Sequence, residues 1–203
     1  MFDPYMVELA STVTNTLFLL GTASLVIIIA YLTVAFNNKK LANKNRWLPK
    51  IVIGVVFGLL SAYGTLMAVK LADGTIPNVR ELGAMMAGVA GGPVGGLIAG
   101  LIGGIHRFSV GGITMIPCGV ATILVGLIAG LVSMKLTGKY YLLKAAVVGI
   151  VLESFAMGLV FVFVPFETAY MAVYQVYIPM VAASTIGLVL WTYFLNKLKA
   201  PKN

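Results

Sequence analysis

The sequence predicts an all-α polytopic membrane protein, a helical bundle that contains a short glycine-rich hairpin. Two observations predict this class: 60% of the 203 residues are hydrophobic while only 10% are charged, and apolar stretches long enough to cross a bilayer recur along the chain. A soluble domain of this length could not bury so much apolar surface. The single cysteine, Cys118, excludes a disulfide within the chain.

Crossing a hydrocarbon core of about 30 Å takes about 20 apolar residues. We expect one transmembrane domain over residues 1–203, with full spans at about 12–36, 51–70, 114–134, 144–165 and 174–195. Residues 77–107 differ, because Gly91-Gly92-Pro93 divides them into the arms 77–92 and 93–107. Each arm reaches only about 22 Å as a helix, so the two form short spans or a re-entrant hairpin. The N-terminus lacks the basic region of a cleavable signal peptide, so we expect the first span to stay in the mature protein.

Basic residues predict the sidedness. Eleven of the fourteen lysines and arginines fall in 37–50, 135–144 and the C-terminal tail, which the positive-inside rule places in the cytoplasm. The N-terminus and a loop over 165–173 are then expected outside. The net charge of +8 is explained by these short loops better than by a nucleic-acid-binding face, so no nucleic-acid partner is expected.

The chain enters residues 82–134 from outside and leaves them inside, so it crosses an odd number of times. A hairpin that goes in and returns, followed by a span at 114–134, meets this condition. Arg80 and Arg107 then share one extracytoplasmic mouth at similar depth. Glycines at every fourth residue, with the repeated GLIAGL at 96–101 and 126–131, predict close helix packing.

The arginine pair is the first candidate for ligand chemistry. Two guanidinium groups in a poorly hydrated pocket suit bidentate capture of a carboxylate or phosphate. Two alternatives stay open: arginines at span ends also snorkel to lipid phosphates, and Glu81 is placed to pair with Arg80.

Other polar residues lie close to this mouth. Asn78 is a hydrogen-bonding candidate or a turn residue after a proline. Cys118 and Thr122, one helical turn apart, either line the pocket or serve as a small apolar and a back-bonded side chain. His106, the single histidine, is expected to be an interfacial residue, since no cluster of metal-ligating residues accompanies it.

Glu153 is an acid near the middle of the span at 144–165. A carboxylate there is expected to be protonated, paired, with Ser154 and Ser184 as local partners, or facing a polar cavity, and it is a candidate functional acid. The sequence shows no catalytic constellation, phosphate loop or metal motif, so we expect neither an enzyme active site nor a cofactor.

An ordered series of motifs resembles the membrane domain of LytS-type sensor histidine kinases. The series runs Asn78-x-Arg80, GGPVGG at 91–96, HR at 106–107, GG at 111–112, GIVLES at 149–154 and IPM at 178–180. The similarity covers about residues 40–195. Two departures, Ala121 in place of a serine and Ser184 in place of an asparagine, bear on the identity of the ligand.

The resemblance implies a plasma-membrane receptor module that senses a small extracellular carboxylate, pyruvate above all. Its matching positions are Arg80, Arg107 and Cys118. It further implies a cytoplasmic kinase or similar output, either in a longer chain or in a partner protein, and leaves a homodimer open. Glycine patterning also resembles the S-components of energy-coupling-factor transporters, so uptake of a small organic solute is the alternative function. A purely structural membrane module is the third.

Overall fold

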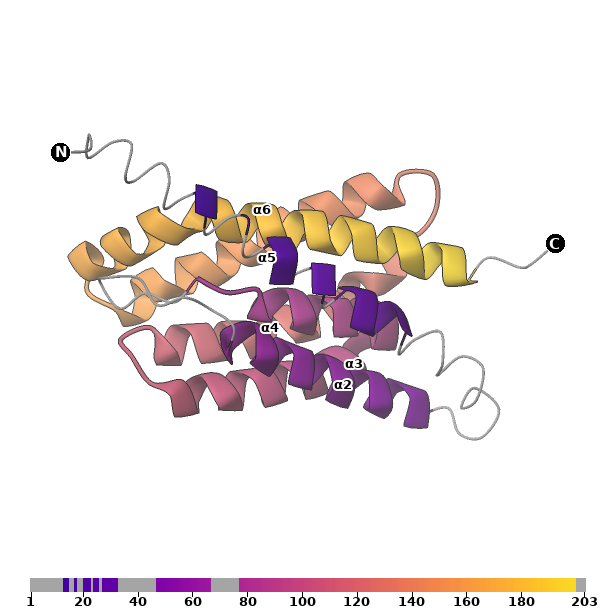
Figure 1. The fold of residues 1–203 in the computed structure, drawn as a ribbon, viewed down its shortest axis with the longest axis horizontal. Coiled ribbons are helices and arrows are strands. Elements are labelled where there is room, and N and C mark those ends of the chain that lie inside the picture. The colour runs from indigo at the N-terminus through magenta and orange to yellow at the C-terminus, as the bar shows by residue number, and fades with distance from the viewer. Residues whose placement is uncertain are drawn as a thin grey trace.

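The computed structural model describes residues 47–66 and 77–199, together with scattered positions between 13 and 32. The expected span at 12–36, the basic loop before Trp47 and the end of the span at 51–70 lie wholly or partly outside these residues. The helices of the described chain are α2 Leu48–Leu66, α3 Arg80–Val110, α4 Met115–Val132, α5 Tyr141–Phe163 and α6 Phe166–Lys199, with a short 3-10 helix η1 at Ser133–Lys135. They run side by side along the long axis (Figure 1).

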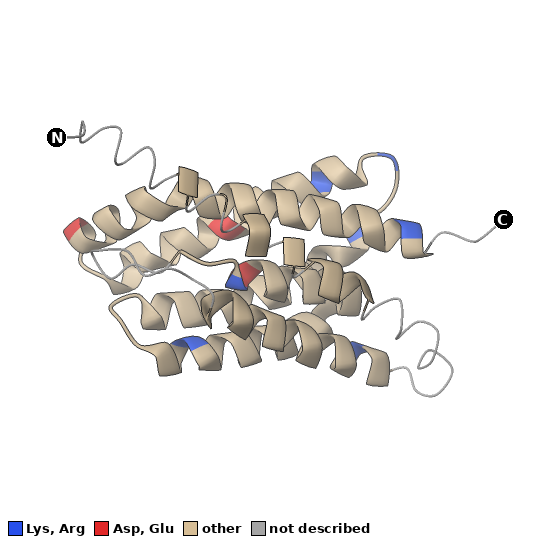
Figure 2. Ribbon diagram, viewed as in Figure 1, with Lys and Arg blue, Asp and Glu red and all other residues tan. Residues whose placement is uncertain are grey.

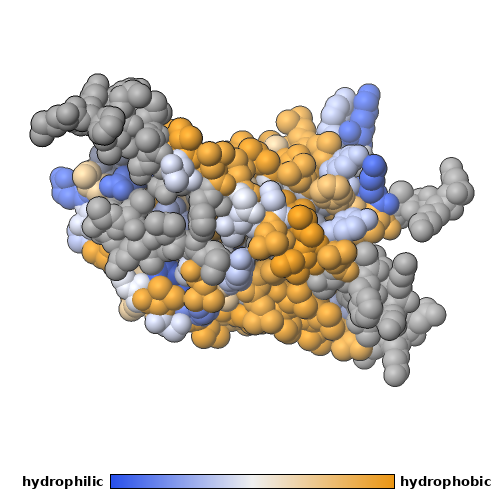
Figure 3. Space-filling model, in the orientation of Figure 1, coloured by the Kyte–Doolittle hydropathy of each residue, from blue (hydrophilic) through white to orange (hydrophobic). Residues whose placement is uncertain are grey.

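All five long helices are long and apolar enough to cross a membrane. Apolar side chains cover the middle of the face seen in Figure 3, and hydrophilic residues gather toward the ends. The predicted fold class, a polytopic membrane helical bundle, is therefore confirmed.

The helix α3 is a hairpin of two helical arms, residues 80–91 and 93–110. Its break is Gly92, whose φ of 70° and ψ of −163° are not helical, followed by Pro93 inside the element. The arms run antiparallel, because Gly83 of the first arm and Gly103 of the second both pack against Ser61 of α2. The chain therefore enters and leaves α3 at the same end of the bundle, as predicted from the odd number of membrane crossings between residues 82 and 134.

The hairpin reaches along nearly the whole length of α2. At its open end, Gly64 packs against the backbone of Arg80, and at its tip a Cβ on Gly91 would lie 3.6 Å from the carbonyl oxygen of Lys50. Lys50 belongs to the first turn of α2. The two short arms thus reach almost as deep as a full span.

Glycines let the hairpin pack backbone to backbone against α4. A Cβ on Gly88 would lie 2.6 Å from the nitrogen of Gly130, and one on Gly100 would lie 2.8 Å from the Cα of Ile123. Gly96 and Gly126 each lie against the other's carbonyl. These two residues open the two copies of GLIAGL, so the repeated segment marks where the helices touch.

Charges separate the two ends of the bundle. The described lysines from Lys50 to Lys197 lie where α2 and α5 begin and where η1 and α6 end, and Glu167 lies at the other end (Figure 2). The structure therefore groups the described lysines at one end, as the positive-inside argument requires, whichever side of the membrane that end occupies.

The helix α6 begins at Phe166, eight residues before the expected span, so the expected loop at 165–173 is mostly helical. Polar residues such as Glu167 lower the hydropathy of this segment, so a hydropathy pattern does not predict the extension. Stacking at i, i+4 spacing supports it, because the rings of Phe166, Tyr170 and Tyr174 have successive centroid distances of 6.2 and 5.9 Å.

In its C-terminal half, α6 packs against the first arm of α3. The indole Nε1 of Trp191 donates to the carbonyl oxygen of Met86 at 3.1 Å. One turn closer to the open end, Leu82 packs against Gly187. These contacts set a parallel register in which residue 82 is level with residue 187.

Candidate functional site

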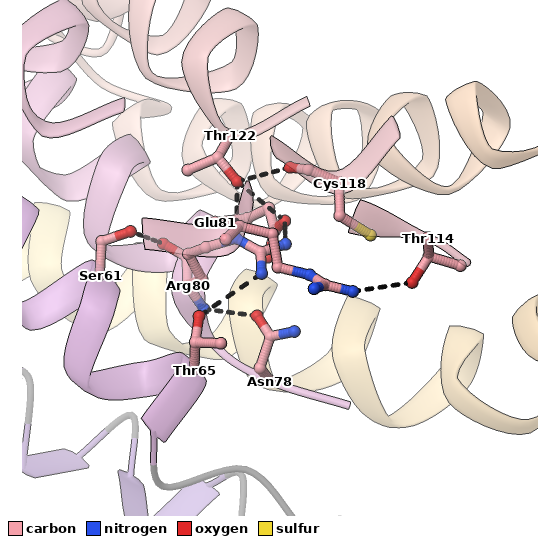
Figure 4. Close-up of polar contacts among 9 residues, drawn as sticks. Ser61, Thr65, Asn78, Arg80, Glu81, Thr114, Cys118 and Thr122 are labelled. Carbon is pink, nitrogen blue, oxygen red and sulfur yellow. Dashed lines mark hydrogen bonds and ion pairs between the residues drawn. The ribbon is translucent and has the colours of Figure 1, made fainter. Parts of the chain in front are cut away.

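Arg80 is fully buried at the first position of α3, with 0% of its surface exposed. Its Nη2 forms an ion pair with Glu81 Oε1, and its Nε donates to Thr122 Oγ1 at 2.7 Å. Nη1 lies 3.4 Å from Thr65 Oγ1 (Figure 4). The pairing of Arg80 with Glu81, one of the alternatives left open by the sequence, is the arrangement in the structure.

The backbone of Arg80 is held as firmly as its side chain. Asn78 Oδ1 accepts the N–H of Arg80 at 3.0 Å, and the hydroxyl of Ser61 donates to its carbonyl oxygen at 2.9 Å. Asn78 thus makes the turn contact expected of an asparagine after a proline. Gly64 leaves room for the close approach of α2.

Arg107 lies near the end of the second arm and is 2% exposed. Its Nη1 donates to the carbonyl oxygen of Gly111, and its Nη2 donates to Thr114 Oγ1 at 3.0 Å. Gly111 and Gly112, with φ of 77° and 91°, turn the chain back so that Thr114 faces the guanidinium.

The two arginines meet at the open end of the hairpin, as expected. They lie within electrostatic range of each other, although Arg80 bonds toward Thr122 and Arg107 toward Thr114, eight residues nearer the start of α4. Their guanidinium groups therefore differ in depth, which corrects the expectation of similar depth. The reason is that Arg80 turns inward to its buried acid.

Cys118 lies between the two arginines on α4. Its thiol lies within electrostatic range of both guanidinium groups. The Thr122 hydroxyl lies 2.8 Å from the carbonyl oxygen of Cys118 and 3.3 Å from Glu81 Oε1, and its single proton serves one of them at a time. Thr122 is therefore both a back-bonded hydroxyl and a direct partner of Arg80.

A cavity of about 20 Å³ opens beside these groups. Its lining comes from the residues before α3 and α4 and from α4, α5 and α6 themselves: Asn78, Thr114, Cys118, Met157, Val160, Ala172, Val173, Val176 and Met180. This volume holds about one water molecule. A three-carbon acid needs more room, and the flexible side chains of Met157 and Met180 are the ones best able to yield it.

Glu153 is completely buried on α5, and neither carboxyl oxygen has a hydrogen-bond partner. It lies within electrostatic range of Glu81 and Arg80 and faces Ser184, whose hydroxyl also lacks a partner. Ser154, the other expected neighbour, instead bonds to the hydroxyl of Tyr177 at 2.9 Å. An ionised carboxylate at the centre of a span costs at least about 2.5 kcal/mol, so an isolated one calls for a functional explanation.

Three residues of the site were not singled out from the sequence. Ser61 and Thr65 lie one turn apart in an otherwise apolar span, which is a usable signal for a polar helix face. Thr114 gave no such signal, because its role depends on the glycine turn before it. His106 lies next to Arg107 and its buried Nδ1 has no partner. Across the described residues, no group of three or more His, Cys, Asp or Glu side chains is placed to hold a metal ion.

Comparison with known proteins places this geometry in context. The family model described as 5TMR of 5TMR-LYT matches residues 33–198. The sensor histidine kinase BtsS of Escherichia coli strain K12 is 35% identical over 158 residues, which are 74% of this chain and 28% of that protein. No solved structure matches the chain.

Two further relatives are more distant. The sensor protein LytS of Bacillus subtilis strain 168 is 34% identical over 119 residues, covering 57% of this chain and 20% of that protein. The sensor histidine kinase YpdA of Escherichia coli strain K12 is 30% identical over 131 residues, covering 63% and 23%. The chain thus spans less than a third of the length of the curated relatives it matches.

Proposed function

The chain belongs to the 5TMR-LYT family, and from this premise we propose that it binds a small carboxylate at its arginine mouth and passes the signal to a histidine kinase output. Membership confirms the resemblance to LytS-type sensors. It also identifies the chain as a multi-pass plasma-membrane sensor domain. The ligand class, the output and the orientation are our proposals.

One observation carries the ligand class. The cavity is lined by Asn78, Thr114 and Cys118, and each of these touches or adjoins an arginine that is buried in apolar surroundings. Buried guanidinium groups suit carboxylates, because their planar donors match two oxygens at once and water is excluded.

Arg107 is the first contact for an entering carboxylate. Its present partners are a carbonyl oxygen and the Thr114 hydroxyl, both neutral acceptors that a charged carboxylate replaces favourably. Arg80 supplies the deeper positive charge, and Asn78 and the Cys118 thiol add polar groups to the lining. Thr122 keeps Arg80 oriented from behind.

The proposed orientation places the cavity outside and the lysine-rich end inside. A soluble anion then reaches the mouth directly. The C-terminal helix α6 leaves the membrane on the cytoplasmic side, where a kinase of the kind named in the relatives operates.

The test is isothermal calorimetry on the chain in lipid nanodiscs, titrated with two- to six-carbon carboxylates including pyruvate. Replacing Arg107 by lysine keeps the charge but removes the planar fork. We expect Arg107→Lys to weaken binding by about 1.5–3 kcal/mol, which is about ten- to a hundredfold. Lys144→Ala, at the opposite end of the bundle, is the control and should bind like the wild type.

Wild-type affinity in both Arg80→Lys and Arg107→Lys would contradict binding of the carboxylate by the two guanidinium groups, since lysine keeps the charge but lacks the planar fork. Accumulation of labelled carboxylate in proteoliposomes would instead support the transporter alternative. A sensor domain binds the ligand without such accumulation.

A further inference from the structure

The cavity leads into a second group of polar residues one helical turn deeper. On α4 the step runs from Cys118 to Thr122, on α5 from Met157 to Glu153, and on α6 from Met180 to Ser184. We call the deeper group the buried polar cluster; its members are Arg80, Glu81, Thr122, Glu153 and Ser184. All of them are buried in an otherwise apolar interior.

Helix register brings Glu153 to within about one helical turn of Arg80. Residue 82 is level with 187, so Ser184 lies level with the first turn of α3. Gly149 of α5 packs against Thr185 of α6, and α5 runs antiparallel to α6, so Glu153 lies one turn further toward the cavity. The electrostatic contacts of Glu153 with Glu81 and Arg80 agree with this placement.

The cluster has an excess of unpaired acceptors. Both oxygens of Glu153 and Glu81 Oε2 have no hydrogen-bond partner, and neither does the Ser184 hydroxyl. Unpaired buried polar atoms in a native structure call for a further group. The Ser184 hydroxyl can donate one proton, which leaves two of the three unpaired carboxyl oxygens without a donor, and a proton carried by Glu153 itself meets the need most simply.

The summed charge of the side chains at the site indicates a function for this proton. Arg80, Glu81 and Arg107 together carry +1, and a protonated Glu153 leaves that sum unchanged. A monocarboxylate then neutralises the site. If Glu153 is ionised, the sum is already zero, and an entering anion adds uncompensated charge to a poorly hydrated interior.

We infer that Glu153 holds the charge-balancing proton of the anion site, so that a monocarboxylate binds only to the form in which Glu153 is neutral. This inference rests on the proposed function and adds a proton to it. The receptor then reads the carboxylate and the proton concentration together.

Other titratable groups face this region and need controls. Arg80 and Glu81 come from α3, Cys118 comes from α4, and His106 of α3 is next to Arg107 in the sequence. On α6, Ser184 faces Glu153, and Tyr177 is occupied by Ser154. Histidine is the side-chain type that changes charge near neutral pH, so His106 needs its own control.

The experiment measures pyruvate binding by calorimetry, with the full chain in phosphatidylcholine nanodiscs, from about pH 5.5 to about pH 8.5. We expect the affinity to fall with rising pH and to approach a tenfold loss per pH unit, the slope for one proton. Buffers of different ionisation enthalpy count the proton taken up on binding. Glu153→Gln should bind at every pH with the affinity of the wild type in acid, because glutamine is permanently neutral.

Two controls keep the other titrating groups apart. His106→Gln should retain the pH slope, and Cys118→Ser should retain it whatever it does to the affinity itself. Infrared spectroscopy of the wild type should show a protonated carboxyl band that is absent from Glu153→Gln. The proton count and this band decide the matter even where the variant folds poorly.

Three results would overturn the inference while leaving the proposed function standing. They are a flat pH profile in the wild type, a persistent slope in Glu153→Gln, and loss of binding by folded Glu153→Gln in acid. Rescue of the affinity at high pH by added sodium would assign the balancing charge to a metal cation and equally refute the proton. If the wild type binds no carboxylate at any pH, the proposed function fails as well.

Discussion

Replacing Gly88 by alanine tests the packing that holds the arginine hairpin in place. A Cβ at this position would lie 2.6 Å from the nitrogen of Gly130 and 2.7 Å from the carbonyl oxygen of Gly126. Ordinary van der Waals contact begins at 3.4 Å, so the shortfall is about 0.8 Å. Both obstructing atoms are backbone, so relief requires the first arm and α4 to separate.

We expect Gly88→Ala to lower the free energy of unfolding by about 1–3 kcal/mol, the usual cost of overpacking. Gly158→Ala is the matched control, because Gly158 is also helical but nothing lies within 4 Å of its added Cβ. There alanine should stabilise by about 0.5–1 kcal/mol through helix propensity alone. The two substitutions should therefore differ by at least about 1.5 kcal/mol.

Unfolding by SDS titration in matched micelles, followed by tryptophan fluorescence, measures this difference, because Trp191 is buried against the first arm. Pyruvate affinity should fall in Gly88→Ala as well, since Thr122 would move away from Arg80. Equal unfolding midpoints for the two alanine variants would refute the close approach of the hairpin to α4.

Two further predictions concern charge and sidedness. Glu81→Gln leaves Arg80 buried without a counter-charge and should lower the free energy of unfolding by about 3–5 kcal/mol. Glu167 is exposed, so Glu167→Gln should change this free energy by less than about 0.5 kcal/mol. Similar values for the two variants in SDS titration would contradict a buried ion pair. In a cysteine-free background, Ser109→Cys should react with a membrane-impermeant maleimide added outside cells, whereas Thr137→Cys should react only after permeabilisation, and the reverse pattern would invert the proposed topology.

The hairpin was predictable because its signals are local. Gly92 and Pro93 interrupt a helix wherever they occur together, and the count of crossings then required the chain to return. The helix ends were less predictable. A hydropathy pattern predicts only the part of a helix that lies in the apolar core of the bilayer. The helix α6 starts earlier, at Phe166, because aromatic residues stack along a helix that extends past the apolar stretch.

The residues of the site could be predicted better than the hydrogen bonds and ion pairs that they form. Arg80 and Arg107 followed from two charges placed in an apolar segment of known topology. Whether Arg80 faces a ligand, a lipid or Glu81 depends on one side-chain rotamer, which the neighbouring helices select and the local sequence does not. The cavity was beyond sequence reasoning for the same reason, since its lining comes from four separate parts of the chain, between Asn78 and Met180.

The contacts of α6 indicate how a change at the cavity reaches the opposite end of the bundle. Pro179 lies between two lining residues and removes one helix hydrogen bond there, so bending of α6 costs least at the cavity itself. Further along, Gly187 and Trp191 hold α6 against the first arm of α3. The part of α6 that reaches the lysine-rich end therefore moves together with the arm that carries Arg80. Any ligand that displaces Arg80 from its buried acid thus acts on the same packed unit that leads to the C-terminus.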